Sequence, residues 1–141
     1  MISYNAQGVP MPDIDEAGLS AWLRSVAATY NKVVGDVCYI FVGDETMLSI
    51  NRRFLGHDYY TDHIGFDYGK DDALCGDIYI SLDTVASNAR LFGTTPGEEL
   101  HRVIAHGLLH LCGLRDETPE ERAAMQEAED KALRQFIIHN S

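Results

Sequence analysis

Apolar residues recur at helical spacing near the N-terminus and again through the last third of the chain. From about Asp15 onward, one face of a predicted helix carries Leu19, Trp22, Leu23, Val26, Ala27 and Tyr30. A second such face begins after Thr95 and is made of Leu100, Val103, Ile104, Gly107, Leu108 and Leu111. A third begins after Thr118 and is made of Met125, Ala128, Ala132, Leu133 and Phe136. The pattern therefore predicts three amphipathic helices.

Start and stop signals support these helices and add two shorter ones. The segments TPGE (95–98) and TPEE (118–121) each place Thr at the N-cap, Pro at the first helical position and Glu three residues after the cap. Asp44 is expected to cap a short helix that turns Met47, Ile50 and Phe54 inward and stops near Gly56. Another short helix is expected from Asp83 to about Phe92, ended by Gly93.

Four segments have the composition of strands. Residues 1–5 form a short one, and the continuous apolar run VCYIFV (37–42) favours a buried central strand. DHIGFDY (62–68) and DIYISL (77–82) are two more, with GKDDALCG (69–76) expected as a surface loop between them. The order of elements predicts an α+β fold, a small mixed sheet of about four strands packed with about five helices, in a single domain spanning 1–141.

Composition restricts the partners and the compartment. The formal net charge of −11 repels nucleic acid at long range, so DNA is not expected as a partner. The net charge does not exclude a basic cleft at one place on the surface. No apolar run approaches the roughly 20 residues that span a bilayer. The N-terminus lacks an export signal, and the three cysteines form no CxxC pair. We expect a cytoplasmic protein with free thiols and no membrane partner.

His106 and His110 lie one helical turn apart at the edge of the second apolar face, so both imidazoles can converge on one ion. Gly107 stands where a zinc protease of the HExxH type carries its glutamate base. Gly113 ends the helix, and the returning chain offers Asp116 or Glu117 as a third ligand, with Asp116 preferred. Such a site leaves a coordination position open for activated water. The alternative is two histidines at the helix edge without a ligand.

Two glutamates near this helix stand out. Glu129 falls within the apolar face of the last helix, where a carboxylate needs a partner. It is interpreted either as an acceptor that orients a metal-binding imidazole or as a salt-bridged residue at the edge of the face. Glu99 lies two turns before His106, and an ordinary exposed glutamate is the favoured interpretation.

Three motifs occur together in one order: an N-x-x-F…D-x-x-TD segment at 51–62, GDIYISLDT at 76–84 and HGLLHLCG at 106–113. In these the chain resembles the YbeY family of bacterial single-domain, metal-dependent endoribonucleases of ribosomal RNA maturation and small-subunit quality control. The resemblance implies one zinc ion per chain, or another divalent metal, held by His106, His110 and residue 116 above the GDIYIS strand. The family's run H-G-x-L-H-L-x-G-Y-D-H ends in a third histidine, which is Asp116 here. We expect a less acidic bound water or a changed metal preference.

Other departures concern RNA. The family commonly has an arginine at the position of Leu55, and Arg52 and Arg53 are candidates to replace it, with Arg115 as a further phosphate contact. His63 and Gly65 also alter the strand after the TD pair. The expected function is cleavage of single-stranded ribosomal RNA on the small subunit, with the general acid and base unassigned. The alternatives are a metalloprotease-like hydrolase, a non-haem iron oxygenase, and a non-catalytic ribosome-assembly factor stabilised by its metal.

Overall fold

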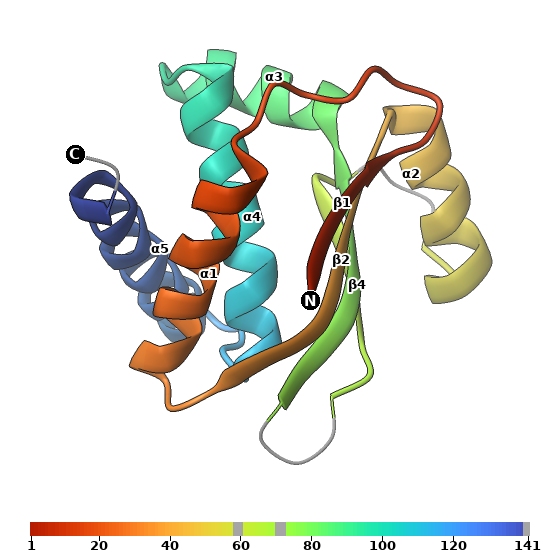
Figure 1. The fold of residues 1–141 in the computed structure, drawn as a ribbon. Coiled ribbons are helices and arrows are strands. Elements are labelled where there is room, and N and C mark those ends of the chain that lie inside the picture. The colour runs from red at the N-terminus through yellow and green to blue at the C-terminus, as the bar shows by residue number, and fades with distance from the viewer. Residues whose placement is uncertain (58–60, 70–72, 140–141) are drawn as a thin grey trace.

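A computed structural model describes residues 1–57, 61–69 and 73–139. Its elements in chain order are β1 (Ile2–Ala6), α1 (Glu16–Thr29), β2 (Val33–Val42), α2 (Asp44–Ile50), the π-helical turn η1 (Asn51–Leu55), β3 (His63–Asp67), β4 (Ala73–Ser81), α3 (Leu82–Phe92), α4 (Pro96–Leu111) and α5 (Pro119–His139). This is the predicted α+β fold, with four strands and five α-helices in the described part of the chain (Figure 1). None of the described helices is long and apolar enough to cross a membrane.

The sheet has the strand order β1-β2-β4-β3. β2 pairs in parallel with β1 and β4, and β3 pairs antiparallel with β4 at the edge. The apolar run 37–42 therefore lies in a central strand, as predicted. Helices α1, α4 and α5 lie on one side of the sheet and α2 lies on the other (Figure 1). This layering explains why both faces of β2 are apolar.

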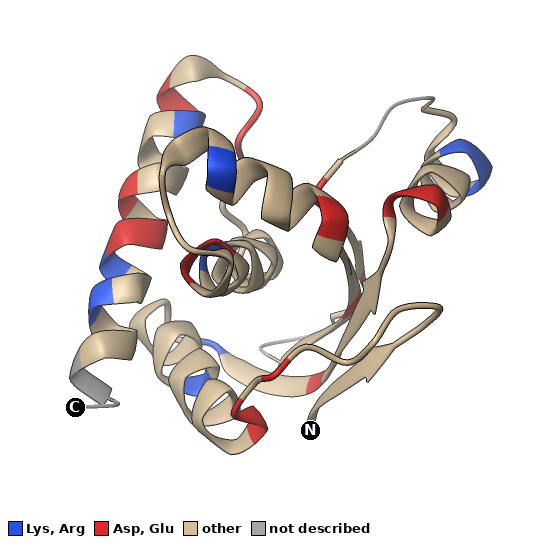
Figure 2. Ribbon diagram, turned by 90° about the horizontal axis from the view of Figure 1, so that it is seen from above, with Lys and Arg blue, Asp and Glu red and all other residues tan. Residues whose placement is uncertain are grey.

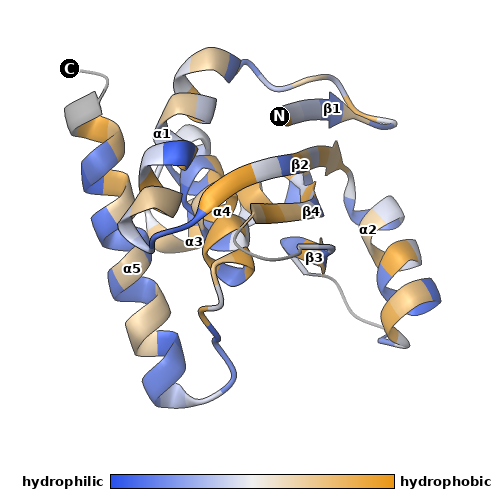
Figure 3. Ribbon diagram, turned by 60° about the horizontal axis from the view of Figure 1, so that its bottom comes forward, coloured by the Kyte–Doolittle hydropathy of each residue, from blue (hydrophilic) through white to orange (hydrophobic). Residues whose placement is uncertain are grey.

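The larger core lies between the sheet and the side that carries α1, α4 and α5. Trp22 of α1 is at its centre, where its indole Nε1 donates a hydrogen bond of 2.7 Å to the Ala132 carbonyl of α5. The predicted inward face of α4 is buried here in full. α5 alternates hydrophilic and hydrophobic residues along its length (Figure 3), because it covers α4 from outside and turns its other face to solvent.

The second core lies under α2 and corrects one expectation. Ile40, Val42, Met47 and Ile64 form it. Phe54 was expected to point inward but is 60% exposed, whereas Asn51 is 1% exposed. A π turn takes one more residue than an α turn, so η1 shifts the inward position along the chain.

The N-cap of α2 is Gly43, so the prediction that Asp44 caps this helix was wrong. The Asp44 carboxylate instead accepts hydrogen bonds of 2.6 Å from the hydroxyls of Ser81 and Thr84, which ties α2 to the start of α3. Ser81 is also the N-cap of α3. The caps predicted at Thr95 and Thr118 are confirmed, since each hydroxyl accepts from the backbone N–H three residues later.

The expected loop at 69–76 was too long. Ala73–Gly76 belong to β4, where Ala73, Leu74 and Gly76 pair with β2, and Gly76 also pairs with Asp67 of β3. Residues 70–72 of that expected loop lie outside the described residues. Small residues and glycine gave this segment the composition of a turn, but the close approach of β3 requires a glycine there, because a Cβ at Gly76 would lie 2.5 Å from the Phe66 carbonyl oxygen.

A pair of stacked tyrosines gives a first test of how α4 is held on the sheet. The Tyr39 hydroxyl is buried and donates a 2.9 Å hydrogen bond to the Ile104 carbonyl, whereas that of Tyr4 pairs with Ser20 at 3.1 Å in a partly buried position. We expect Tyr39→Phe to lower the free energy of unfolding by about 1 kcal/mol and Tyr4→Phe by less, because a buried bond has no water to replace it. Urea denaturation measures the free energy of unfolding of both variants. Equal losses would contradict the conclusion that the buried Tyr39 hydrogen bond contributes more than that of Tyr4.

Candidate metal centre

His106 and His110 lie at the edge of α4 that faces β3, and their Nε2 atoms are 2.9 Å apart. The helix approaches the sheet closely here because it has no side chain at Gly107. A Cβ at that position would lie 2.8 Å from Cγ2 of the buried Ile78 on β4. The glycine that replaces the protease base is thus explained by packing, and the two imidazoles are set at a fixed height above the strand.

Asp116 joins the pair from the chain that returns after α4. Gly113 turns this chain with a φ of 104°. Asp116 Oδ2 then lies 3.2 Å from the Nε2 atom of each histidine. Glu117, the other candidate, pairs with Arg115 at 2.6 Å. The structure therefore brings together the three side chains that the spacing singled out.

The outer nitrogens of both rings are held by oxygen atoms. His106 Nδ1 lies 2.5 Å from Glu129 Oε2, and His110 Nδ1 lies 3.0 Å from the Leu114 carbonyl oxygen. Each of these oxygens accepts a hydrogen bond, so each Nδ1 carries a proton. In a neutral imidazole the Nε2 atom then has a free lone pair, and both lone pairs face the centre of the site.

This donor set tests whether a metal fits. Three acceptor atoms lie 2.9–3.2 Å apart, an arrangement that is repulsive unless a proton or a cation lies among them. A tetrahedral ion with bonds of about 2.0–2.1 Å would separate its ligand atoms by about 3.3 Å, close to what is found. Two imidazoles and a carboxylate, held at these distances, fit a divalent metal ion.

The charges around the two rings differ. Burial lowers the pKa of His106, but the hydrogen bond and negative charge of Glu129, with Asp62 and Asp116, outweigh it and the pKa is raised. Burial and the neighbouring His106 lower the pKa of His110. Of the two rings, His106 therefore holds a proton more readily than His110.

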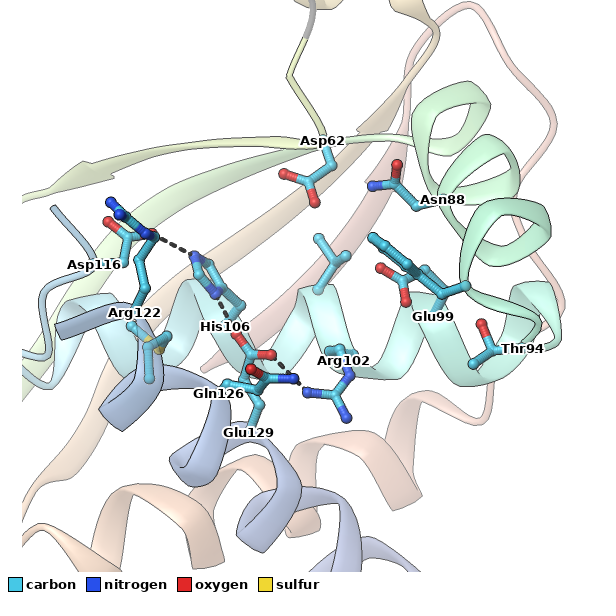
Figure 4. Close-up of a pocket in the computed structure, with 13 residues that line it drawn as sticks. Asp62, Asn88, Thr94, Glu99, Arg102, His106, Asp116, Arg122, Gln126 and Glu129 are labelled. Atoms are coloured by element: carbon cyan, nitrogen blue, oxygen red, sulfur yellow. Dashed lines mark hydrogen bonds and ion pairs between the residues drawn. The ribbon is translucent and has the colours of Figure 1, made fainter. Parts of the chain in front are cut away.

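Glu129 makes both kinds of contact considered for it, one with an imidazole and one with a guanidinium. Its Oε2 meets His106 and its Oε1 accepts from Arg102 Nη1 at 2.7 Å, as Figure 4 shows. Arg102 Nη2 also donates a hydrogen bond of 2.6 Å to Asp130 Oδ1. The buried carboxylate is paired on both oxygens, which is why it can lie within the apolar face of α5.

His63 is the residue that sequence reasoning left out of the site. Its ring centroid lies 4.4 Å from that of His106 and 5.6 Å from that of His110. One ring nitrogen from each of the three histidines lies within 4.8 Å of the others, so they form a cluster that could hold a metal ion. The signal in the sequence was weak, because only the pairing of β3 with β4 brings His63 over α4.

Two hollows flank the histidine pair. The first, of about 520 Å³, is lined by Asp62, Asn88, Glu99, Arg122 and His106, among others (Figure 4). The second, of about 490 Å³, is lined by His63, Thr61, Leu55 and His110, among others. Because His106 lines one and His110 the other, the two hollows lie on either side of the pair and are together termed the groove.

Glu99 was expected to be exposed, and this was wrong. It is 5% exposed at the wall of the first hollow. Burial raises its pKa, and the nearby Asp62 carboxylate adds to the shift. Glu99 lies near the start of α4, which suggested an exposed position. Helix α3 packs against α4, and Glu99 is therefore buried.

The candidate phosphate contacts lie at the margins of this groove. Arg52 and Arg53 are exposed on η1, and the basic end of α2–η1 stands apart from α4 and α5 (Figure 2). The Arg115 guanidinium is paired with Glu117 and, at 3.5 Å, with Glu121. Arg122, which the sequence did not single out, lines the first hollow and donates to the Glu117 carbonyl at 2.7 Å.

Comparisons with known proteins agree over nearly the whole chain. The sequence profile of the family described as Endoribonuclease YbeY matches residues 9–137. Proteins of that name from Bacteroides thetaiotaomicron and Phocaeicola vulgatus are 53% and 54% identical, each over 94% of this chain and 96% of its own length. The solution structure of TM1509 from Thermotoga maritima superposes with a TM-score of 0.68 at 28% identity, covering 96% of this chain and 89% of that one.

Proposed function

Because the chain belongs to the endoribonuclease YbeY family, we propose that it cleaves single-stranded RNA with the help of a metal ion held by His106, His110 and Asp116. The chain is a hydrolytic endoribonuclease of ribosomal RNA maturation. The observation that carries the proposed site is the convergence of two imidazole nitrogens and one carboxylate oxygen within 3.2 Å of one another. Residues 1–141 act as one metal-dependent hydrolase domain.

The ion is zinc, one per chain, since imidazole and carboxylate ligands suit it. When bound, it supplies Lewis-acid polarisation of the phosphodiester and an acidified water. The chain's own residues fix where this happens. Glu129 and the Leu114 carbonyl hold the outer nitrogens of His106 and His110, which keeps both rings in the orientation that a ligand needs.

The groove selects a single strand. Its two hollows give room for nucleotides on both sides of the histidine pair. Phe92 lines the first hollow and is 63% exposed. An RNA base can stack on this ring only if the base is not already paired and stacked within an RNA helix. Arg122 is close enough to meet a phosphate within the first hollow, whereas Arg52, Arg53 and Arg115 would meet the strand further out.

The partner follows from the substrate. Ribosomal RNA is encountered on or beside the small ribosomal subunit, in the cytoplasm, and the protein must approach it with a net charge of −11. Long-range attraction to RNA is therefore weak, and contacts with basic ribosomal proteins would compensate for it.

The first experiment measures cleavage of a single-stranded ribosomal RNA fragment before and after chelation and zinc reconstitution. The same sequence as a duplex and as DNA are the controls. We expect cleavage of the single strand alone, lost on chelation and restored by metal. Metal-dependent stability without any cleavage would instead favour the assembly-factor function, and cleavage of a peptide would favour the protease.

The contact between Glu129 and His106 gives a matched pair of variants. We expect Glu129→Gln to lower zinc affinity by about 10–100-fold, because the amide loses the charge that holds the imidazole N–H. Asp130→Asn is the control, since it also removes an Arg102 partner but does not touch His106. Titration against a chelator of known affinity measures both. Equal losses would mean that Arg102, and not Glu129, determines the affinity.

A further inference from the structure

The site proposed above leaves His63 and its neighbour Asp62 without a role. His63 opens β3, the edge strand, and faces α4 from across the groove. Its side chain is 19% exposed, and its Nδ1 lies 2.9 Å from Asp62 Oδ1. Within the described part of the chain, no hydrogen bond to its Nε2 atom is found.

The three histidines share one arrangement. In each, Nδ1 is engaged by an oxygen: that of Asp62 for His63, of Glu129 for His106 and of the Leu114 carbonyl for His110. An acceptor on one ring nitrogen is what orients metal-binding imidazoles and leaves the other nitrogen free to bind. A histidine that only filled space between β3 and α4 would not need a carboxylate to fix its tautomer.

The distances place His63 beside the same two histidines. A nitrogen of its ring lies within 4.8 Å of those of His106 and His110. Its ring meets that of His106 edge to face at 4.4 Å between centroids. It comes from β3, whereas the pair comes from α4 and Asp116 from the loop that follows, so a shared ion would tie three separate segments together.

We propose that His63 is a fourth protein ligand of the metal ion, with Asp62 as its positioning residue. This rests on the proposed function for the ion itself. The ligand set then consists of three imidazoles and one carboxylate. Four protein ligands fill a tetrahedral shell, so room for water requires five or six coordination positions. Such a site accommodates cobalt, nickel, iron or manganese as well as zinc.

Cobalt titration of the metal-free full-length protein tests this without any cleavage assay. We expect His63→Asn to weaken cobalt and zinc affinity by at least about tenfold and to alter the visible cobalt bands. We expect His63→Cys to keep binding and to gain a near-ultraviolet thiolate-to-cobalt band, which a residue with a purely structural role would not produce. Asp62→Asn should weaken binding less than His63→Asn does.

The outcomes separate the two proposals. Unchanged affinity and spectrum in His63→Asn, together with no thiolate band in His63→Cys, overturn the fourth ligand. If His110→Gln abolishes binding in the same series, the three-residue site still stands. If the wild type binds no cobalt or zinc, or His110→Gln binds as the wild type does, the proposed site itself fails.

Discussion

His110→Gln is expected to reduce RNA cleavage by at least about a hundredfold. Residues that hydrogen-bond to the ligands of a metal site are each worth about 10–100-fold in metal affinity or activity, so the loss of a ligand itself should exceed that range. His110 is placed for this role by two contacts: Nε2 lies 3.2 Å from Asp116 Oδ2, and Nδ1 is held by the Leu114 carbonyl. The measurement is initial cleavage rate of the single-stranded fragment with zinc in excess.

His101→Gln is the matched control, because it makes the same change on the same helix. His101 faces away from the site and packs on Phe136 at 4.4 Å and Trp22 at 6.1 Å between ring centroids. It should lose some stability and keep its metal and its activity. A parallel fall in cleavage in both variants would point to damaged folding and not to a lost ligand.

Thermal unfolding of the same proteins tests whether the ion is bound at His110. A metal at 100 times its dissociation constant stabilises the folded state by about 2.7 kcal/mol, provided that it does not bind the unfolded chain. Chelation should therefore lower Tm for the wild type and for His101→Gln but leave that of His110→Gln unchanged. A wild type that keeps its Tm on chelation would contradict tight binding at this site.

The sequence predicted the elements that rest on local rules. Helical periodicity placed α1, α4 and α5, and the two Thr-Pro starts placed Thr95 and Thr118 as caps. The one-turn spacing and the following glycine brought together His106, His110 and Asp116 for the same reason. All of these depend on residues within one or two turns of each other, so the chain around them decides their geometry.

The predictions that failed concern residues whose positions depend on contacts between distant segments. Phe54 is exposed because η1 widens the helix by one residue per turn, and Glu99 is buried where α3 packs against α4. His63 joins the histidines only because β3 pairs antiparallel with β4 and faces α4. No periodicity in the sequence records a strand pairing of this kind, so the part of the site that β3 contributes could be found only in the fold.

That dependence on β3 can be tested at Gly76, where we expect an alanine to cost about 3 kcal/mol of unfolding free energy or more. The added Cβ would lie 2.5 Å from the Phe66 carbonyl oxygen of β3 and 3.1 Å from the Leu111 side chain of α4. The first of these is a backbone atom and cannot move aside without breaking the pairing of β3 with β4. Overpacking of a well-filled site usually costs about 1–3 kcal/mol, and the backbone contact puts Gly76 at or beyond the upper end.

Gly65→Ala makes the same change on β3, at a residue that pairs with Ile78 of β4, but nothing lies within 4 Å of its Cβ position. An alanine there should be neutral or stabilising by up to about 1 kcal/mol, because glycine loses more freedom on folding. Urea denaturation measures the free energy of unfolding of both variants, and zinc titration at low temperature measures their zinc affinity. We expect Gly76→Ala to weaken zinc binding as well as stability, because displacing β3 moves Asp62 and His63 away from α4. Lost stability with unchanged zinc affinity would mean that the metal depends on α4 and Asp116 alone, and that β3 serves only as the far wall of the groove.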